Sequence, residues 1–307
     1  MHIVDLHCDT ISEIYNQGLS LYKNNLHFDL ERAKRANIYL QFFALFSNPT
    51  NQESILRDIF KQVDKFYYEI DLNKQHIYHV LKYEDIIIAN KNNKLSCILH
   101  LEGAEVIQND IEILRILYRL GLRSLGLTWN NRNLLADGVG EGIGAAGISS
   151  FGKIIIRTLE ELGIILDLAH ISEPSFYQAL ELYNKPVMVT HANAASLCNL
   201  PRNLKDHQLK ALADNGGVIG VNQVKFFIKE SNPTINDMID HIVYISELIG
   251  PDYIALGSDF DGADKMVINN VEQYSLIPEL LQKRGFSLQE IQNIIRGNAL
   301  RVIKQII

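Results

Sequence analysis

Six histidine and carboxylate side chains in this sequence could together bind divalent metal ions. They are His7, Asp9, Glu102, His170, His191 and Asp259. Imidazole and carboxylate groups are ordinary ligands of zinc and similar cations, and a carboxylate such as Glu102 can bridge two of them. Two adjacent cations can hold a water as hydroxide near neutral pH and polarise a carbonyl group. The set therefore predicts a hydrolase that uses two divalent cations to cleave an amide bond.

The spacing of His7 and Asp9 allows both side chains to bind one cation. Alternate residues of a β-strand point to the same face, about 7 Å apart along the chain. His7 and Asp9 would thus share a face, with Cys8 turned away. A His-x-Asp pair is common by chance, so the position of the whole set is the stronger signal. All six residues fall at or just after the end of a strand-like run, where barrel enzymes assemble their active sites.

The elements that must position these residues are eight short runs rich in apolar and β-branched residues. We expect strands at 3–9, 39–46, 96–102, 123–129, 163–169, 186–191, 217–222 and 253–259. Segments with helical periodicity lie between most of them, at 53–71, 111–120, 151–162, 174–183, 205–215 and 234–249. Such alternation indicates a parallel sheet, and eight units favour a closed α/β barrel, the (β/α)₈ TIM barrel. Residues 271–283 and 287–307 are expected to form closing helices, and 12–37 a long loop with a short helix.

Length and composition fit one such barrel. A (β/α)₈ barrel of about 250 residues or more folds as one unit, and this chain has 307 residues with only 7 prolines and no linker-like tract. We therefore expect a single domain over residues 1–307. The 29 basic and 36 acidic residues give a formal charge of −7. Without a basic face to bind phosphates, nucleic acid is not an expected partner.

The cellular location is predicted from features that the sequence lacks. A strand-like run begins almost at Met1, without the apolar region and cleavage site of a signal peptide. Apolar stretches fall short of the roughly 20 residues that span a bilayer, so we expect a cytoplasmic protein that does not associate with membranes. Cys8, Cys97 and Cys198 form no Cys-x-x-Cys pair, and their odd number predicts free thiols.

Five short motifs carry a resemblance to a known family. They are Asp5-Leu6-His7-Cys8-Asp9-Thr10, Leu101-Glu102-Gly103, Asp167-Leu168-Ala169-His170-Ile171-Ser172, Thr190-His191 and Gly257-Ser258-Asp259-Phe260-Asp261-Gly262. In order and spacing they resemble the membrane (renal) dipeptidase family, peptidase family M19, and most of all its soluble bacterial members. The resemblance covers nearly the whole chain and implies a TIM barrel of the metal-dependent amidohydrolase type.

The resemblance implies a role for each of the six residues. His7 and Asp9 would bind a first zinc ion, Glu102 would bridge both, and His170 and His191 would bind a second. Asp259 would lie at the first metal as the catalytic carboxylate. It would take a proton from the bridging water and deliver it to the leaving amine. Members of the family cleave dipeptides, often with a D-residue at the C-terminal position, and the family also implies a homodimer.

Substrate binding is expected from residues near two of these motifs. Arg202 matches the family's arginine for the terminal carboxylate of the substrate, which suits the fork geometry of guanidinium. Trp129 departs from the family, which commonly has a histidine after Leu-Thr at this position. An indole N–H donates one hydrogen bond but cannot transfer a proton as imidazole does. Trp129 therefore puts substrate choice or rate in doubt, and Asn130 or Asn131 could supply the missing donor.

Three other features could be mistaken for parts of a site. The segment Gly142-Ile143-Gly144-Ala145-Ala146-Gly147 matches a dinucleotide-binding pattern. It lies more than ten residues beyond the expected strand, so a loop over the barrel mouth is the better interpretation. His100 shares a strand face with Glu102 and is expected to pack inside the barrel. Asp261 is expected to structure its loop through Asx-type hydrogen bonds.

Two alternative functions stay open at this point. Another amidohydrolase-type barrel hydrolase, such as an N-acyl amino acid deacylase or a lactonase, would use the same cations. Its substrate would differ in the leaving group and in the need for a terminal carboxylate. A non-catalytic metal-binding barrel is the second alternative. The complete ligand set argues against it, because a scaffold has no need of a full catalytic centre.

Overall fold

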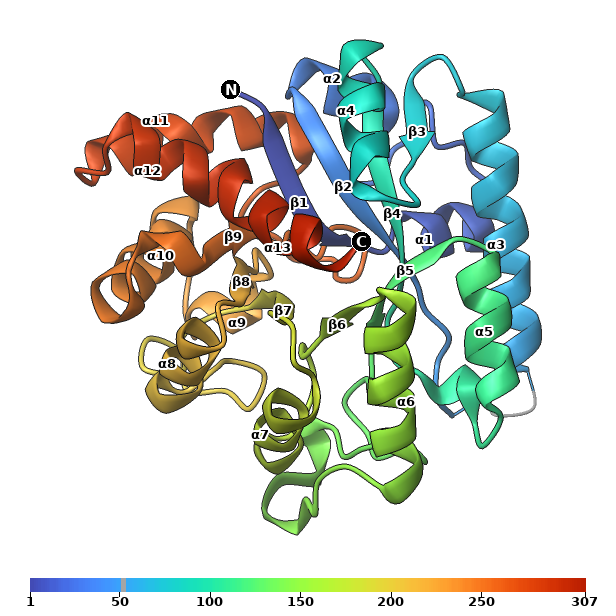
Figure 1. The fold of residues 1–307 in the computed structure, drawn as a ribbon. Helices are drawn as coiled ribbons and strands as arrows, with labels where there is room; N and C mark the ends of the chain where they lie inside the picture. Colours follow the sequence, from blue (N-terminus) through green and yellow to red (C-terminus); the bar gives the residue numbers. More distant parts are fainter. Residues whose placement is uncertain (51–53) are drawn as a thin grey trace.

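Eight parallel strands follow one another around the sheet in the order of the chain (Figure 1). The computed structural model describes residues 1–50 and 54–307. The strands are β1 (Ile3–Cys8), β2 (Ile38–Leu45), β4 (Leu95–Leu101), β5 (Leu122–Gly126), β6 (Ile165–Asp167), β7 (Met188–Ala192), β8 (Val218–Val221) and β9 (Ile254–Leu256). This chain-order arrangement is the one predicted for a barrel rather than an open sheet.

The barrel is completed where β1 meets the end of β9. Cys8 and Phe260 form a parallel bridge. Asp9 N–H donates to the Phe260 carbonyl at 2.8 Å, and Asp259 N–H donates to the His7 carbonyl at 3.1 Å. The predicted (β/α)₈ barrel is confirmed, and its seam places Asp9 and Asp259 side by side.

Helices surround the strands (Figure 1). The α-helices are α1 (Thr10–Gln17), α2 (Leu30–Arg35), α3 (Ile55–Leu72), α4 (Tyr83–Lys91), α5 (Ile111–Arg119), α6 (Ser150–Leu162), α7 (Glu173–Leu182), α8 (Asp206–Asp214), α9 (Lys225–Ile228), α10 (Ile235–Ile249), α11 (Ile277–Lys283), α12 (Leu288–Gln292) and α13 (Asn298–Ile306). Short 3₁₀ turns lie at Glu105–Ile107, Val139–Gly144, Pro251–Tyr253 and Val271–Leu276, and a π-helical turn lies at Asn293–Gly297. Among the described residues, no helix is long and apolar enough to cross a membrane.

Local signals set the ends of the helices that flank the later strands. The Ser149 hydroxyl accepts a hydrogen bond from Gly152 N–H at the start of α6, and Gly163 ends that helix with φ of 70°. Ser172 caps α7 in the same way, with Pro174 in its first turn. These are the ordinary capping preferences of serine, proline and glycine. Both helices begin and end within one residue of the bounds predicted from helical periodicity.

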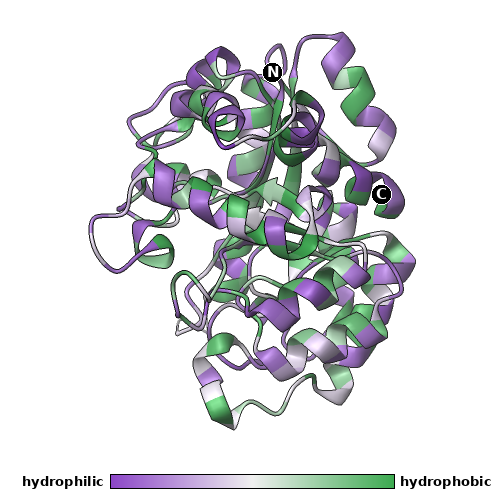
Figure 2. Ribbon diagram, turned by 90° about the vertical axis from the view of Figure 1, so that its left-hand side faces the viewer, coloured by the Kyte–Doolittle hydropathy of each residue, from purple (hydrophilic) through white to green (hydrophobic). Residues whose placement is uncertain are grey.

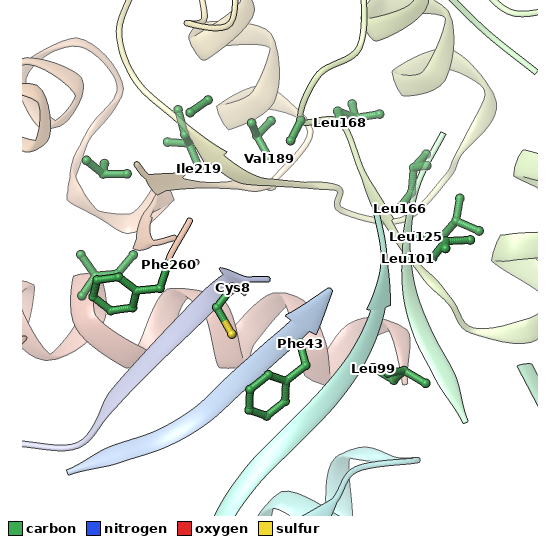
Figure 3. Packing of buried hydrophobic residues seen from close by; sticks show 14 of the residues in the cluster. Cys8, Phe43, Leu99, Leu101, Leu125, Leu166, Leu168, Val189, Ile219 and Phe260 are labelled. Carbon is green, nitrogen blue, oxygen red and sulfur yellow. The ribbon is translucent and has the colours of Figure 1, made fainter. Parts of the chain in front are cut away.

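Two apolar layers stabilise the barrel. The outer layer lies between strands and helices, and Figure 3 shows Cys8, Phe43 and Val189 pointing away from the barrel axis into it. Figure 2 shows apolar residues along the central strands and polar residues on the outer turns of the helices. The inner layer joins the first inward-facing residues of the strands to one face of α13; it includes Val4, Leu40, Ile98, Ile165, Met188, Val218, Ala299, Val302 and Ile303. Helix α13 thus covers the end of the barrel where the strands begin. All three cysteines are free and buried, as predicted.

Some predicted elements were incomplete. The region 12–37 contains α2 and most of α1, and a short strand β3 (Ile77–His79) pairs with β4 beside the barrel. Neither β3 nor α4 was predicted. Three residues are too few for a periodic signal, and the consecutive Ile86, Ile87 and Ile88 of α4 do not follow the helical period. Glu53, at the start of a predicted helix, lies outside the described residues, and α3 begins at Ile55.

Candidate metal centre

His7 and Asp9 reach the barrel mouth from an irregular end of β1. The pairing of β1 with β2 shifts in register between Asp5 and Cys8, and such a bulge re-aims the neighbouring side chains. His7 Nε2 lies 3.2 Å from Asp9 Oδ2, and both side chains are buried. The two groups therefore converge on one position, as two ligands of one cation would.

His191 is turned to the centre by a similar irregularity in β7. The pairing of β7 with β8 shifts between Val189 and Ala192. The Thr190 carbonyl then faces the backbones of Gly220 and Gly257, where an added Cβ would overlap its oxygen. These two positions need glycine because of this close approach, which neighbouring strands impose and local sequence does not reveal.

Glu102 lies between two groups of candidate ligands. Its Oε1 is 2.9 Å from His170 Nε2 and 3.5 Å from His191 Nε2, whereas its Oε2 is 3.8 Å from His7 Nε2. His170 Nε2 and His191 Nε2 are 2.9 Å apart. Each oxygen of one carboxylate therefore faces a different histidine group, which is the arrangement of a bridging ligand.

The six predicted residues form three overlapping triads with the geometry of a metal site. These are His7, Asp9 and Glu102; Glu102, His170 and His191; and His7, His191 and Asp259. The ligand atoms of each triad lie within 4.8 Å of one another, and every member is buried. The donor set of imidazole and carboxylate groups fits divalent cations such as zinc. The structure thus brings all six together.

His170 and Asp259 adopt an unusual backbone conformation. Their φ angles are 63° and 64°, in the left-handed region that few residues other than glycine occupy. Such conformations concentrate at functional sites, where the surrounding structure holds them. Asn222 Nδ2 donates to Asp259 Oδ2 at 2.8 Å. An added Cβ at Gly262 would overlap carboxylate oxygens of Asp9 and Asp259, so this glycine allows the loop to close over both acids.

The electrostatics of the cluster show a site built for added positive charge. Burial raises the pKa of Asp259 to about 6 and that of Asp9 to about 7, and the charge of Glu102 adds to both shifts. Burial would raise the pKa of Glu102 as well, but His7 and the other histidines hold it well below its usual range. Burial would lower the pKa of His7, yet Glu102 and Asp9 raise it to about 10. A cation bound by His7 would displace this proton.

Arg202 lies beside the second group of ligands. It is buried, and its Nη2 donates to the His191 carbonyl at 3.0 Å. Its Nε is also buried and has no hydrogen-bond partner among the described residues. A buried donor left unpaired is costly, so a ligand oxygen at this position would remove a real penalty.

Trp129 and Asn130 border His170. The half-buried Trp129 ring has its centroid 6.1 Å from the His170 ring and 5.4 Å from the Phe46 ring. Asn130 Oδ1 lies 2.8 Å from His170 Nδ1. Asn131, the other predicted donor, lines a separate cavity of about 670 Å³ between neighbouring loops. Trp129 and Asn130 thus lie next to His170, whereas Asn131 lines a different cavity.

The residues judged structural from the sequence have structural contacts. His100 Nδ1 lies 2.9 Å from Ser124 Oγ inside the barrel. Asp261 accepts hydrogen bonds from His27 N–H at 2.7 Å and from the Thr10 hydroxyl at 2.6 Å, which ties its loop in place. The glycine-rich segment forms part of a loop at the barrel mouth, where Val139 N–H donates to the His170 carbonyl at 2.8 Å.

Sequence reasoning missed several polar residues that touch the ligands. Asn222 contacts Asp259, and Thr190 and Asp167 lie behind His191. Asn222 carried a usable signal, because it ends the predicted strand 217–222 at the same level as the ligands. Asp167 and Thr190 were visible only as parts of family motifs, and their contact depends on the packing of β6 beside β7.

A closed parallel barrel with histidines and carboxylates gathered at the C-terminal ends of its strands defines a metal-dependent barrel hydrolase. The model of the family "Membrane dipeptidase (Peptidase family M19)" matches residues 1–307. The chain therefore belongs to the membrane dipeptidase family, and it is a metallopeptidase that acts as a dipeptidase. The predicted resemblance is confirmed.

Individual relatives agree with this assignment. The chain is 28% identical over 295 residues to dipeptidase tcpJ of Claviceps purpurea, an alignment that covers 91% of this chain and 69% of that protein. It is 30% identical over 306 residues to an uncharacterized dipeptidase of Schizosaccharomyces pombe, with 92% and 74% coverage. A Rhodobacter sphaeroides metallo peptidase, solved with a phosphinate mimic of the dipeptide L-Ala-D-Ala, superimposes with a TM-score of 0.93. That match is 21% identical and covers 100% and 99% of the two chains, and it establishes the shared fold.

Proposed function

We propose that this chain hydrolyses dipeptides with two divalent cations, zinc by family resemblance. His7 and Asp9 would hold the first, His170 and His191 the second, Glu102 both, and Asp259 would complete the first position. The observation that carries the proposal is the placement of the two Glu102 oxygens, 2.9 Å from His170 and 3.8 Å from His7. When bound, two such cations activate a water molecule and polarise the carbonyl that it attacks.

Asp259 is the proposed proton carrier. It is buried among the ligands, and the Asn222 amide holds one of its oxygens. Burial raises the pKa of Asp259 to about 6 in the metal-free chain. Its place among the candidate ligands puts this carboxylate within reach of the attacking water, as a general base and acid must be. In this role Asp259 takes a proton from the attacking water and returns it to the leaving nitrogen.

Arg202 is the proposed partner of the substrate's terminal carboxylate. Its buried Nε lacks a partner among the residues described, and guanidinium pairs well with carboxylate. The Arg202 guanidinium lies at a fixed place beside the candidate metal ligands. It therefore favours substrates whose carboxylate is one residue from the scissile bond, as in a dipeptide. The Rhodobacter sphaeroides protein was solved with a mimic of L-Ala-D-Ala bound, so a dipeptide with a C-terminal D-residue is the first substrate to test.

A substrate panel tests this proposal. L-Ala-D-Ala and L-Ala-L-Ala should be cleaved, whereas the same dipeptides with an amidated C-terminus should react at least tenfold more slowly. Equal rates on amidated dipeptides, N-acyl amino acids or lactones would favour the deacylase or lactonase alternative. Elemental analysis of the purified protein should give about two cations per chain, and a metal-loaded chain without turnover would favour the non-catalytic barrel. The cytoplasmic location and the homodimer stay predictions.

A further inference from the structure

A hydrogen-bond chain lies behind His191 on the side away from the other ligands. His191 Nδ1 is 2.9 Å from Thr190 Oγ1, and the Thr190 hydroxyl is 2.7 Å from Asp167 Oδ2. The other Asp167 oxygen accepts from Thr190 N–H at 2.8 Å and from Ala169 N–H at 3.0 Å. All of these residues are buried, so the series of hydrogen bonds is shielded from water.

The donors and acceptors in this series of hydrogen bonds decide which His191 nitrogen carries the proton. A carboxylate accepts hydrogen bonds, so the Thr190 hydroxyl donates its only hydrogen to Asp167. The Thr190 oxygen must then accept from His191, which places the imidazole proton on Nδ1. The lone pair of Nε2 is left facing Glu102 and His170, as a neutral histidine ligand requires.

Asn130 does the same for His170 by a shorter route. Its Oδ1 is 2.8 Å from His170 Nδ1, and a carbonyl oxygen only accepts, so the proton again lies on Nδ1. The backbone of Asn130 is held in turn, because Gly140 N–H donates to its carbonyl at 2.7 Å. An added Cβ at Gly138 would overlap that carbonyl. The loop at 138–147 is therefore packed against the residue that orients His170.

The third histidine has no comparable support. His7 Nδ1 is buried and without a hydrogen-bond partner in the part of the chain that the structure describes. We infer that Asn130 and the Thr190–Asp167 pair are positioning residues: they fix His170 and His191 as Nδ1–H tautomers, so that both Nε2 lone pairs face the second cation position. This inference rests on the proposed two-metal function. It gives Asn130 a role other than substrate binding.

Cobalt binding by metal-free protein tests the inference without turnover. Binding of Co²⁺ to the wild-type chain is measured by calorimetry and by the visible absorption of the bound ion. Thr190→Val keeps the shape and removes the hydroxyl, and it should weaken one of two binding events by 10- to 100-fold, the usual effect of losing such a partner. Thr190→Ser keeps the hydroxyl and should restore wild-type affinity. The control Thr128→Val removes another buried threonine hydroxyl, one without a partner among the described residues, and should leave both affinities unchanged.

Asn130 provides an independent variant, because its half-buried side chain lies in a loop and its removal spares the core. Asn130→Ala should weaken the same binding event as Thr190→Val, and Asn130→Asp, which keeps an acceptor oxygen, should not. Unchanged cobalt affinity in both Thr190→Val and Asn130→Ala would overturn the inference. So would an Asn130→Ala variant that raises only the KM for dipeptides. A wild-type chain that binds a single Co²⁺ would instead count against the two-metal function. The loss of cobalt affinity at that one site in Thr190→Val and Asn130→Ala would still test the positioning role.

Discussion

The two ends of the barrel are built for different purposes. Where the strands begin, the interior is apolar and covered by α13, with Val4, Leu40 and Ile98 packed against Val302 and Ile303. Where the strands finish, the interior holds histidines and carboxylates, two strand irregularities and two left-handed residues. Strained backbone and buried charge at the mouth lower the stability of the fold. The apolar packing under α13 must offset this loss.

A polar layer lies between these two ends. His100, Ser124, Asp167 and Thr190 are buried inside the barrel or directly behind the ligands, and they contact one another or His191. Along its axis the barrel interior therefore has three layers. Apolar side chains come first, then polar side chains that hold the histidines in place, and finally the candidate ligands. If this division is real, changes at one end should alter stability alone and changes at the other should alter activity alone.

The largest effect is expected from Asp259→Asn at the mouth. Asparagine tolerates the left-handed conformation and keeps the shape of the side chain, but it cannot carry a proton. We expect kcat for a dipeptide to fall by about 10³-fold, within the usual range for a lost general acid–base group. Metal content and the urea midpoint should stay near their wild-type values. Undiminished kcat in this variant would remove Asp259 from the mechanism.

Gly257→Ala should lower both stability and metal affinity, because Gly257 packs directly against the residue before His191. The added methyl group would overlap the Thr190 carbonyl, which is backbone and cannot rotate away. We expect a loss of about 3 kcal/mol in the free energy of unfolding, the upper range for overpacking, together with weaker cobalt binding through the displaced His191. Urea unfolding and cobalt titration measure the two effects. Gly144→Ala is the matched control, since its added Cβ meets nothing within 4 Å.

Ile303→Ala should affect the packed end alone. Ile303 is fully buried in the inner apolar layer, and truncating such a side chain costs about 3 kcal/mol. Urea unfolding should show this loss, while kcat and KM for a dipeptide should remain within twofold of wild type at 25 °C. A large fall in kcat would show that the packed end and the mouth of the barrel are coupled.

The sequence predicted those features of the barrel that depend on local pattern. Strand-like runs and their ends located the six candidate ligands that the structure brings together, and helical periodicity located most of the helices. Register was not predictable in this way. The irregularities at His7 and His191 arise from pairing with β2 and β8, and the Asp167–Thr190 contact joins residues 23 positions apart. Such features depend on neighbours in space rather than neighbours in sequence.

The smallest effect is expected far from the mouth, at His79 in the unpredicted strand β3. Burial lowers the pKa of His79 to about 4, and its Nε2 lies 3.2 Å from the Gly121 carbonyl. Between pH 4 and the ordinary histidine value of 6.5, the unfolded chain binds more protons at this residue than the folded chain. The contribution of His79 to the free energy of unfolding is therefore fully present above pH 6.5, and it declines as the pH falls toward 4.

His79→Gln isolates this effect from the other histidines. Glutamine can still donate to the Gly121 carbonyl but does not titrate. From pH 8 to pH 5, the wild-type chain should lose about 2 kcal/mol more of its unfolding free energy than the variant does, as the size of the shift requires. Cobalt affinity at pH 7 should be equal in the two proteins, because β3 lies beside the barrel and holds no ligand. A parallel pH dependence of unfolding in both proteins would mean that His79 binds protons equally in the folded and unfolded chains, which would contradict its lowered pKa.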